Sequence, residues 1–362
     1  MTGKKNKFLY EVVYNTLREE ILGNKHKCND LLPSEREIIE RFKVDRTTVR
    51  KALSLLVADE LVEKKAGVGT KVVYDANQPK FRGSSQNNVA GFFMPKTINP
   101  AERITQPFYS ELYFHLEGYL KKLDYSIIYT TLKDEHELGE ILANQGLQGA
   151  VFLTAVSPQL VEYAKRIKLP SVLVNRFDSD LTCVLGNNVY GGYTAVNYLL
   201  AHKHRNIAII SAPNSYITAQ ERLMGCRKAF EEAGLSMNDA VVVPGEWEYE
   251  SGARAAREIF SVDKSKRPTA LFAFNDMMAM GAISVIREMG LKVPGDVSVI
   301  GFDNVDYLRY TESDLTTIDT QTPLMAQIIA HNLVGLIKKE TPNGMRIDVP
   351  TKLVERKTVL SL

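Results

Sequence analysis

Residues 34–51, SEREIIERFKVDRTTVRK, predict two short helices joined by a tight turn. Ser34 followed three positions later by Glu37 makes a capping box, which marks the start of the first helix. Asp45 can cap the second helix, whose apolar residues recur at helical spacing on one face. The exposed, N-terminal end of this second helix is left to four side chains: Arg46, Thr47, Thr48 and Arg50.

Two helices in this arrangement are typical of a helix-turn-helix, in which the N-terminal end of the second helix enters the major groove of DNA. Residues 8–22 upstream have one apolar face and predict a further helix. Residues 61–74 downstream, LVEKKAGVGTKVVY, predict two short strands around Gly67 and Gly69, which is typical of a β-hairpin wing. We therefore predict a winged helix domain over residues 1–74.

The pattern changes after this domain. Residues 75–88, DANQPKFRGSSQNN, are polar and predict an extended linker. Apolar runs then alternate with amphipathic helices such as 110–123, 191–202 and 219–233. The seven candidate strands lie at 89–94, 125–132, 149–154, 170–175, 206–211, 269–274 and 297–302.

Near-continuous apolar strands separated by helices indicate buried parallel sheets with right-handed crossovers. We predict an α/β fold in which residues 89–362 form two doubly wound lobes. The first lobe covers residues 89–185 and 322–340, and the second covers 186–321 and 341–362.

Composition restricts the class of protein. The chain has 362 residues, 44% of them hydrophobic and 24% charged, which is typical of a globular protein with more than one domain. No apolar run approaches the roughly 20 residues that cross a bilayer, and the N-terminus lacks the apolar core of a signal peptide. We expect a cytoplasmic protein with no membrane contact. Its three cysteines, Cys28, Cys183 and Cys226, are predicted to be reduced thiols.

The charge distribution supports the DNA-binding interpretation without establishing it. The net charge is +2, and residues 1–75 hold 15 Lys and Arg against 12 Asp and Glu, leaving 30 against 31 for the remainder. His202 and His204 lack neighbouring Cys or carboxylate partners, so we predict no metal site and no cofactor.

Polar residues recur where the predicted strands end. Such positions lie at the crevice where open α/β sheets bind ligands. Charged planar groups pair with vicinal hydroxyls, and an aromatic face packs on the C–H surface of a ring. Each residue alone is as consistent with a helix cap or with packing, but their recurrence favours a site for a polyhydroxylated ligand. The set comprises Asn175, Arg176, Arg222, Trp247, Asn275, Asp276, Asp303 and Asn304.

Two families resemble these segments. Residues 8–74 resemble the GntR-type winged helix head through LLPSEREIIERFKVDRTTVRKALSLLVADELVEKKAGVGTKV. Residues 88–362 resemble the sensor body of the lactose/galactose repressor family, which shares its fold with periplasmic sugar-binding proteins. The most specific matching block is PTALFAFNDMMAMGAISVIREMGLKVPGDVSVIGFDN, residues 268–304. The combination is similar to the arabinose-responsive repressors.

The resemblance implies a set of binding residues. The DNA contacts fall on Arg36, Arg46, Thr47, Thr48 and Arg50, with Lys65 and Gly67 in the wing. In the body, the implied ligand contacts are Gln106, Phe108, Tyr109, Asn175, Arg176, Arg222, Trp247, Asn275, Asp276 and Asp303. Asn175 stands where many relatives have Asp. Thr320 stands where the family commonly has Gln, which leaves open whether Asp319 or Gln321 serves instead.

We therefore expect a repressor of sugar-utilisation genes that binds a double-stranded operator as a homodimer on an inverted repeat. Its effector is expected to be a small sugar bound between the lobes, with an arabinose-like pentose as first choice by resemblance. The sequence does not fix whether the effector releases or promotes DNA binding. One alternative is a sugar or nucleoside receptor without a regulatory role. Another is an enzyme, such as a GntR head fused to an aminotransferase, but none of the seven strands is followed by the lysine that this enzyme needs.

Overall fold

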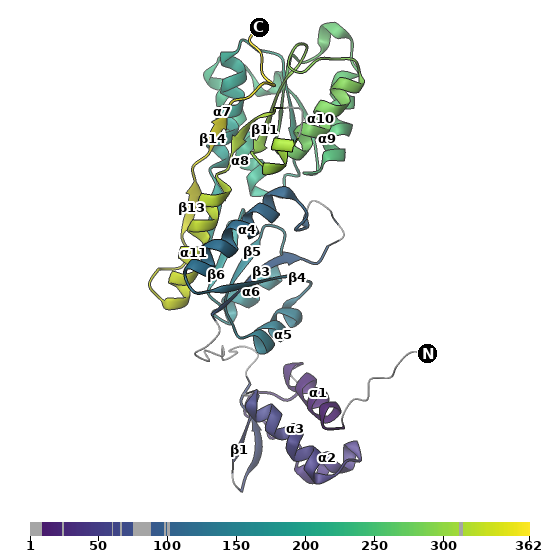
Figure 1. Ribbon diagram of the computed structural model, residues 1–362, viewed down its shortest axis with the longest axis vertical. Helices are drawn as coiled ribbons and strands as arrows, with labels where there is room; N and C mark the ends of the chain where they lie inside the picture. The colour runs from purple at the N-terminus through teal and green to yellow at the C-terminus, as the bar shows by residue number, and fades with distance from the viewer. Residues whose placement is uncertain are drawn as a thin grey trace, which may run out of the picture. The chain divides into compact units, whose positions relative to one another are not determined.

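The computed structural model (Figure 1) describes residues 9–23, 25–59, 61–65, 67–74, 88–97, 99, 102–310 and 314–362. The chain divides into two compact units. One unit contains residues 1–89, 132–148 and 157–169, and the other contains 90–131, 149–156 and 170–362. All but the last residue of the predicted linker lies outside the described residues.

The N-terminal region forms the predicted helix-turn-helix. Its helices are α1 (Leu9–Leu22), α2 (Glu35–Phe42) and α3 (Arg46–Ala58). The capping box at α2 is complete, because Ser34 Oγ accepts from Glu37 N at 3.3 Å and Glu37 Oε2 accepts from Ser34 N at 2.7 Å. The tight turn to α3 passes through Lys43, whose φ of 52° is left-handed. A small buried core joins these helices through residues including Val13, Leu17, Ile38, Val49, Leu53 and Leu56.

The predicted wing is an antiparallel hairpin of β1 (Val62–Lys65) and β2 (Gly69–Val72). Its register pairs Val62 with Val72 and Lys65 with Gly69. Gly67 at the turn has a φ of +78°, a conformation that L side chains rarely adopt. The two glycines noted in the sequence are therefore explained by the hairpin turn.

The first of two large sheets has the strand order β13-β7-β6-β5-β3-β4. Its strands are β3 (Val89–Pro95), β4 (Ser126–Leu132), β5 (Leu147–Leu153), β6 (Ser171–Val174), β7 (Thr182–Gly186) and β13 (Arg346–Val349). Pairs β5–β6, β6–β7 and β7–β13 are parallel. Along the chain, α4 (Pro107–Lys122) follows β3, α5 (Glu135–Gln145) follows β4, α6 (Pro158–Arg166) follows β5, and α11 (Thr322–Lys338) precedes β13. Side chains of α4 and α11 share one buried core with β3, β5, β6 and β7.

The second sheet has the order β14-β12-β11-β10-β8-β9. Its strands are β8 (Ile207–Ser211), β9 (Val241–Pro244), β10 (Ala270–Ala273), β11 (Ser298–Asp303), β12 (Thr316–Asp319) and β14 (Lys352–Val354). The strands pair in parallel except for β14, which is antiparallel to β12. Its helices are α7 (Asn188–Ala201), α8 (Ile217–Glu232), α9 (Tyr249–Phe260) and α10 (Asp276–Glu288). The α7–α8 pair and the α9–α10 pair lie on either side of β11 (Figure 1).

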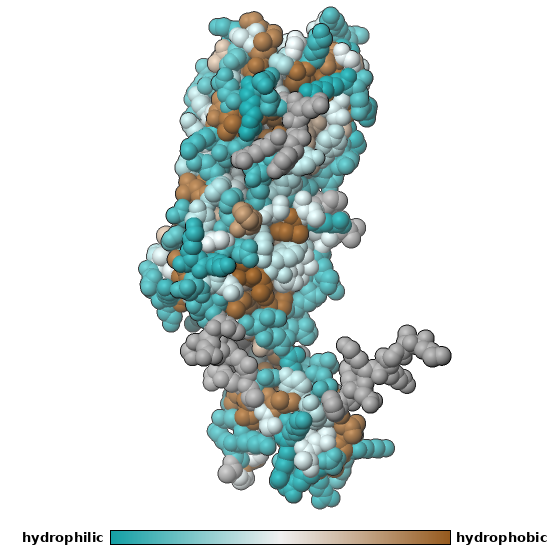
Figure 2. Space-filling view, in the orientation of Figure 1, coloured by the Kyte–Doolittle hydropathy of each residue, from teal (hydrophilic) through white to brown (hydrophobic). Residues whose placement is uncertain are grey.

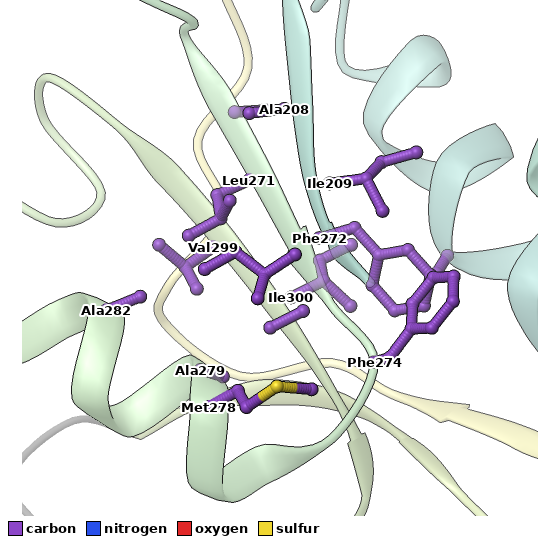
Figure 3. Packing of buried hydrophobic residues seen from close by; sticks show 14 of the residues in the cluster. Ala208, Ile209, Leu271, Phe272, Phe274, Met278, Ala279, Ala282, Val299 and Ile300 are labelled. Atoms are coloured by element: carbon purple, nitrogen blue, oxygen red, sulfur yellow. The ribbon is translucent and has the colours of Figure 1, made fainter. Parts of the chain in front are cut away.

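The core of the second lobe is built by the apolar strands that the sequence predicts. Figure 3 shows Phe272 and Phe274 beside Ile209, and shows Val299 and Ile300 between these strands and Met278 on α10. These side chains are fully buried. On the face seen in Figure 2, apolar residues form separate patches among hydrophilic ones. Burial on both faces of the sheet explains why its central strands read as continuous apolar runs.

The structure adds strands that the sequence did not predict, among them β7 and β12, which are short but buried. The outer strands β9, β13 and β14 are short and largely exposed, so they lack a continuous apolar run. The strand β13 pairs with β7, which places residues 346–349 in the first sheet rather than in the second lobe as predicted. Exposed edge strands carry weak hydrophobic patterning, and only pairing in three dimensions assigns them to a sheet.

The crossing of α7 and α8 requires glycine. A Cβ built on Gly225 would lie 2.0 Å from Val189 O, whereas one built on the exposed helical Gly118 meets nothing within 4 Å. We expect Gly225→Ala to lower the unfolding free energy of the body by about 1–3 kcal/mol. Gly118→Ala, the control, is expected to raise it by about 0.5–1 kcal/mol. Thermal unfolding followed by circular dichroism compares them, and an unchanged midpoint for Gly225→Ala contradicts the close packing.

Candidate functional site

The first turn of α3 is fixed by its N-cap. The Asp45 carboxylate accepts from Thr48 N at 2.9 Å and from Thr48 Oγ1 at 2.7 Å. The hydrogen bonds from the hydroxyl and amide of Thr48 lower the pKa of Asp45 to about 2, and smaller contributions come from Thr47. The negative charge of the ionised cap also interacts favourably with the positive, N-terminal end of the helix dipole. The cap therefore uses Thr48 and, more weakly, Thr47 to hold the exposed end of the helix.

Two arginines of α3 converge on one carboxylate. Glu35 Oε2 accepts from Arg46 Nε at 3.1 Å and from Arg50 Nε at 3.2 Å. The side chains of Arg46 and Arg50 remain 67% and 57% exposed. Partial burial raises the pKa of Glu35, but the hydrogen bonds from both arginines outweigh this and lower it. Glu35, the first residue of α2, thus holds both arginines of the charged face of α3. The sequence analysis did not single out Glu35.

The remaining predicted DNA contacts are also exposed. The Arg36 side chain is 89% exposed and pairs with Glu40 at 3.1 Å. In the wing, Lys65 pairs with Glu63 at 3.1 Å, and Gly67 forms the exposed tip. Lys64, another residue not predicted, lies 3.9 Å from Glu35. Cationic side chains of α2, α3 and the wing are therefore exposed to solvent on this domain.

A cavity lies between elements of the two sheets. It has a volume of about 630 Å³, including space open to solvent at its mouth. Eight of the ten predicted ligand residues line it: Gln106, Phe108, Tyr109, Asn175, Arg222, Trp247, Asn275 and Asp303. The lining also contains residues that the sequence analysis missed, namely Pro107, Thr154, Tyr216, Thr218, Met277 and Val305.

Arg222 is the most constrained side chain of the cavity. It is 5% exposed, and its guanidinium carbon stands 3.6 Å from the centre of the Phe302 ring. Its Nε donates to Asn188 Oδ1 at 3.0 Å, and Nη1 donates to Phe274 O. Burial lowers the pKa of Arg222 to about 10, against the opposing field of Asp303. The arginine stays cationic at neutral pH and presents its remaining donors to the cavity.

Asp303 faces this arginine at the end of β11. Its Oδ1 lies 3.6 Å from Arg222 Nη2, and its side chain is 12% exposed. Burial raises the pKa of Asp303 to about 7, and the Arg222 cation limits the rise. The backbone at Asp303 and Asn304 is left-handed, with φ values of 111° and 59°. This unusual turn directs the loop after β11 toward the cavity.

Two predicted ligand residues, Asp276 and Arg176, do not line the cavity. Asp276 is fully buried, where its carboxylate accepts from Val305 N at 3.0 Å and Thr317 Oγ1 at 2.5 Å. It therefore holds the loop that carries Asp303. Burial, and then the field of Asp303, raise the pKa of Asp276 well above its ordinary value. Arg176 Nη1 donates to Val156 O within the first lobe.

The three residues near the family's glutamine position also lie away from the cavity lining. Thr320 Oγ1 lies 3.3 Å from Asp303 O, and Gln321 Nε2 donates to Pro350 O at 2.5 Å. Asp319 Oδ1 accepts from Gln321 N at 2.7 Å. These bonds join the chain segments that cross between the lobes.

Aromatic rings line two sides of the cavity. Phe108 and Tyr109, at the start of α4, meet edge to face with centroids 5.5 Å apart. Tyr216 and Trp247 meet in the same manner at 5.8 Å. Tyr216 also donates its hydroxyl to Glu102 Oε1 at 2.6 Å, which links the two lobes at the cavity. Tyr216 precedes α8 directly after β8, so its place beyond a strand end was a signal that sequence reasoning could have used.

Metal-ligating side chains and long apolar helices were also sought among the described residues. Within it, no group of three or more His, Cys, Asp and Glu side chains is arranged to hold a metal ion. His204 is buried between Thr269 Oγ1 and Leu360 O, each 2.9 Å from a ring nitrogen, and burial lowers its pKa. No described helix combines the length and apolar character that crossing a membrane requires.

Asp303 predicts how stability depends on pH. Its pKa is about 7 in the native protein against an ordinary 3.8, so the native state binds the proton more tightly than the unfolded state. The contribution of Asp303 to the free energy of unfolding then falls as pH rises from about 4 to 7 and is lost above this range. We expect the fall in thermal midpoint between pH 5 and 8 to be smaller for Asp303→Asn than for wild type. Calorimetry measures both, and parallel pH profiles contradict the assignment.

Comparison with known proteins agrees with this architecture. Residues 9–72 match the model for bacterial regulatory proteins of the gntR family, and residues 196–359 match that for a periplasmic binding protein-like domain. The HTH-type transcriptional repressor PurR of Edwardsiella ictaluri (strain 93-146) is 32% identical over 337 residues, covering 90% of this chain and 96% of that protein. PurR of Aliivibrio fischeri (strain MJ11) is 33% identical and covers 70% of this chain and 78% of that protein.

Two solved structures extend the comparison. The CelR transcriptional regulator in complex with cellobiose aligns with a TM-score of 0.68 and 26% identity, covering 86% of this chain and 90% of that one. A LacI family regulator from Enterococcus faecium with bound ribose aligns with a TM-score of 0.67 and 25% identity, covering 76% and 99%. The chain belongs to the LacI-type family of DNA-binding transcriptional repressors, which are regulators rather than enzymes, and it joins a GntR-family head to a periplasmic binding protein-like effector domain.

Proposed function

We propose that this repressor controls sugar-utilisation genes and that a small sugar in the cavity, an arabinose-like pentose, sets its affinity for the operator. The observation that carries this proposal is the cavity itself. It combines a buried Arg222–Asp303 pair with amide side chains and aromatic faces, on the same chain as a winged helix head.

The chemistry of the lining suits a polyhydroxylated ring. Arg222 can donate paired hydrogen bonds to neighbouring hydroxyls, while Asp303, Asn275, Asn175 and Gln106 supply acceptors and further donors. The rings of Phe108, Tyr109 and Trp247 offer apolar faces for the C–H surface of the sugar. The CelR and Enterococcus faecium relatives were solved with cellobiose and ribose, which supports this class of ligand.

A phosphorylated sugar fits the cavity less well. Arg222 supplies the cationic charge of the lining formed by the described residues, and it already faces the Asp303 carboxyl. A phosphate group carries about two negative charges at neutral pH and needs several charge-assisted donors. The neutral balance of this pair therefore favours an uncharged ligand.

On the DNA side, Arg46, Thr47, Thr48 and Arg50 are proposed to enter the major groove from the N-terminal end of α3. Arg36 on α2 and Lys65 and Gly67 in the wing are proposed to contact the flanking duplex. We propose that residues 1–74 form the head, 75–88 the linker and 89–362 the effector body. Two heads of a homodimer would read half-sites of an inverted repeat about one helical turn apart.

Ligand and operator communicate through the lobes in this proposal. A sugar that bridges both lobes favours the closed cavity, and closure changes the spacing of the two heads in a dimer. Such a coupling is typically about 1–3 kcal/mol, or roughly 5–150-fold in operator affinity. Arg176 and Asp276 are assigned to supporting roles, because their polar atoms bond to the protein outside the cavity.

A thermal-shift panel tests the ligand class. Full-length protein is heated with pentoses, hexoses, their phosphates and nucleosides at equal concentration. A pentose is expected to raise the unfolding midpoint most, because a ligand that binds only the native state stabilises it. The same sugars are added to a gel shift on DNA from the protein's own upstream region. A larger shift from a nucleoside or a sugar phosphate overturns the assignment of the cavity to an uncharged sugar.

A further inference from the structure

An ion pair joins the two lobes outside the cavity lining. Arg346 belongs to β13 in the first sheet, and Glu221 belongs to α8, which packs on the second. Arg346 Nη2 lies 2.6 Å from Glu221 Oε1, and the two side chains are 33% and 11% exposed. Neither residue was singled out by the sequence or by the cavity lining. Glu221 is nevertheless the immediate neighbour of Arg222.

The ion pair connects to the cavity arginine through Asn188. The second carboxylate oxygen of Glu221 lies 3.4 Å from Asn188 Nδ2. Asn188 Nδ2 also donates to Gly186 O at 2.8 Å, at the point where the chain leaves β7 for α7. The amide oxygen of Asn188 accepts from Arg222 Nε at 3.0 Å. An unbroken polar chain therefore runs from the edge strand of one lobe to the cavity arginine of the other.

The side-chain amide of Asn188 is fixed in one orientation by its hydrogen bonds. Asn188 is 1% exposed, and both polar atoms of its side chain have partners in the chain just described. The amide cannot turn to face Arg222 with its NH2 group without losing the Gly186 and Glu221 contacts. A change in the position of Glu221 is therefore transmitted to the orientation of the Arg222 side chain.

Arg346 in turn is fixed on its own strand. Its Nε lies 3.1 Å from Asp348 Oδ1 and 3.2 Å from Oδ2, and its Nη2 lies 2.9 Å from Oδ1. The Asp348 carboxylate, followed by Glu221, raises the pKa of Arg346, so the cation is permanent. The Arg346 guanidinium must therefore move together with β13. Glu221 contacts it from the opposite lobe.

We propose that Glu221 and Arg346 are positioning residues that make the geometry of the ligand-binding Arg222 depend on the arrangement of the two lobes. This inference rests on the proposed function, because it takes Arg222 as the residue that contacts the sugar. Movement of β13 away from α8 frees the Glu221 carboxylate and loosens Asn188, so the Nε of Arg222 loses its fixed partner while Nη1 still donates to Phe274 O. A ligand that needs Arg222 in place therefore favours the lobe arrangement in which the ion pair is formed.

A purely structural ion pair would behave differently. A partly exposed pair contributes little to stability, and its removal should leave the distant cavity unchanged. The chain from Arg346 to Arg222 instead passes through buried polar groups, where the loss of one partner leaves another unsatisfied. The cavity itself should therefore respond to substitutions at residues that do not line it.

Trp247 reports on the cavity without any ligand. It is the single tryptophan of the chain, it lines the cavity, and its ring centre lies 5.3 Å from the Arg222 guanidinium carbon. We would record its emission spectrum and acrylamide quenching in full-length wild type, Glu221→Gln, Arg346→Met and the double variant. Glu288→Gln is the matched control, because Glu288 forms an exposed ion pair with Arg257 at 3.1 Å and takes no part in the contacts from Arg346 to Arg222.

Both single variants are expected to shift the Trp247 emission and increase its quenching, and the double variant is expected to match either single, since all three break one link. Glu288→Gln should resemble wild type. Spectra of Glu221→Gln and Arg346→Met that match Glu288→Gln, or effects that add in the double variant, would overturn the proposal. Circular dichroism identifies a variant that fails to fold, and Arg346→Lys, which keeps the charge, should recover part of the wild-type spectrum.

Titration with L-arabinose and D-ribose adds a ligand readout. Any sugar that binds wild type should bind Glu221→Gln and Arg346→Met about fivefold or more weakly. Binding that is equal in wild type and both variants contradicts the inference. If neither sugar binds wild type, the choice of pentose as effector fails, while the ligand-free Trp247 spectra still decide whether Glu221 positions the cavity.

Discussion

Replacement of Arg222 by alanine is expected to eliminate the ligand response while leaving operator binding intact. The guanidinium is buried against Phe302, Asn188 and Asp303, and the described residues of the lining include no second cation that could take its place. A hydrogen bond from a charged donor contributes about 1.5–3 kcal/mol, and the alanine variant loses those that Arg222 would make to the ligand. Ligand affinity should therefore fall at least about tenfold. The proposed head residues are unaffected, so the operator gel shift without ligand should match wild type.

Arg257→Ala is the control for this experiment. Arg257 is an exposed arginine of α9 that pairs with Glu288 at 3.1 Å, so the variant loses the same charge outside the cavity. It should respond to ligand as wild type does. An Arg222→Ala protein that still changes its operator affinity on addition of ligand would show that the cavity assignment is wrong.

Replacement of Arg50 by alanine is expected to weaken operator binding while leaving ligand affinity unchanged. Arg50 lies on the first turns of α3 and is held by Glu35 with its guanidinium exposed to solvent. A good bidentate arginine–base contact is worth about 1–3 kcal/mol, or roughly 5–150-fold in affinity. Gel shifts at a fixed salt concentration measure this loss, and a titration of ligand against Trp247 fluorescence checks that the body is intact.

The matched control is Lys25→Ala in the same domain. The Lys25 side chain is 64% exposed and pairs with Glu20. Its replacement removes the same positive charge as Arg50→Ala, but at a site outside α3. It should change binding to all DNA sequences equally and only through the salt-dependent term. If Arg50→Ala and Lys25→Ala lose the same affinity, Arg50 is a general electrostatic contributor and its assignment to base recognition fails.

The head was predictable from sequence because its signals are local. The capping box at Ser34 and the Asp45 cap act within four residues of chain, and both form as expected. The glycines of the wing are also local, since the hairpin needs a left-handed residue at its turn. Glu35 was missed because its partners Arg46 and Arg50 lie 11 and 15 residues away, across the turn.

The body was predictable where its strands are buried. Continuous apolar runs located strands such as β10 and β11, and the polar residues after them located Asn275 and Asp303 in the cavity lining. Gln106, Phe108 and Tyr109 were located only by the family resemblance. Rules about strand ends could not separate Asn275, which lines the cavity, from the adjacent Asp276, which points into the lobe. The same limit applies to Arg346, because β13 lacks an apolar run and its partner Glu221 is 125 residues distant.

Of the alternatives that the sequence left open, family membership selects the repressor. The alignment with the PurR repressor of Edwardsiella ictaluri includes 90% of this chain. A repressor is therefore favoured over both the solute receptor and the enzyme. The proposed ligand contacts Arg222 and Asp303 lie within the periplasmic binding protein-like match.

The most direct test of ligand-controlled DNA binding is the operator affinity of the full-length protein, measured with and without the sugar that gives the largest thermal shift. Trp247 fluorescence establishes that the cavity is occupied in the same samples. If the cavity and the head are coupled, adding the sugar should change the operator affinity of wild type about 5–150-fold and leave that of Arg222→Ala unchanged. An operator affinity that is identical in the free and fully occupied protein would contradict the account.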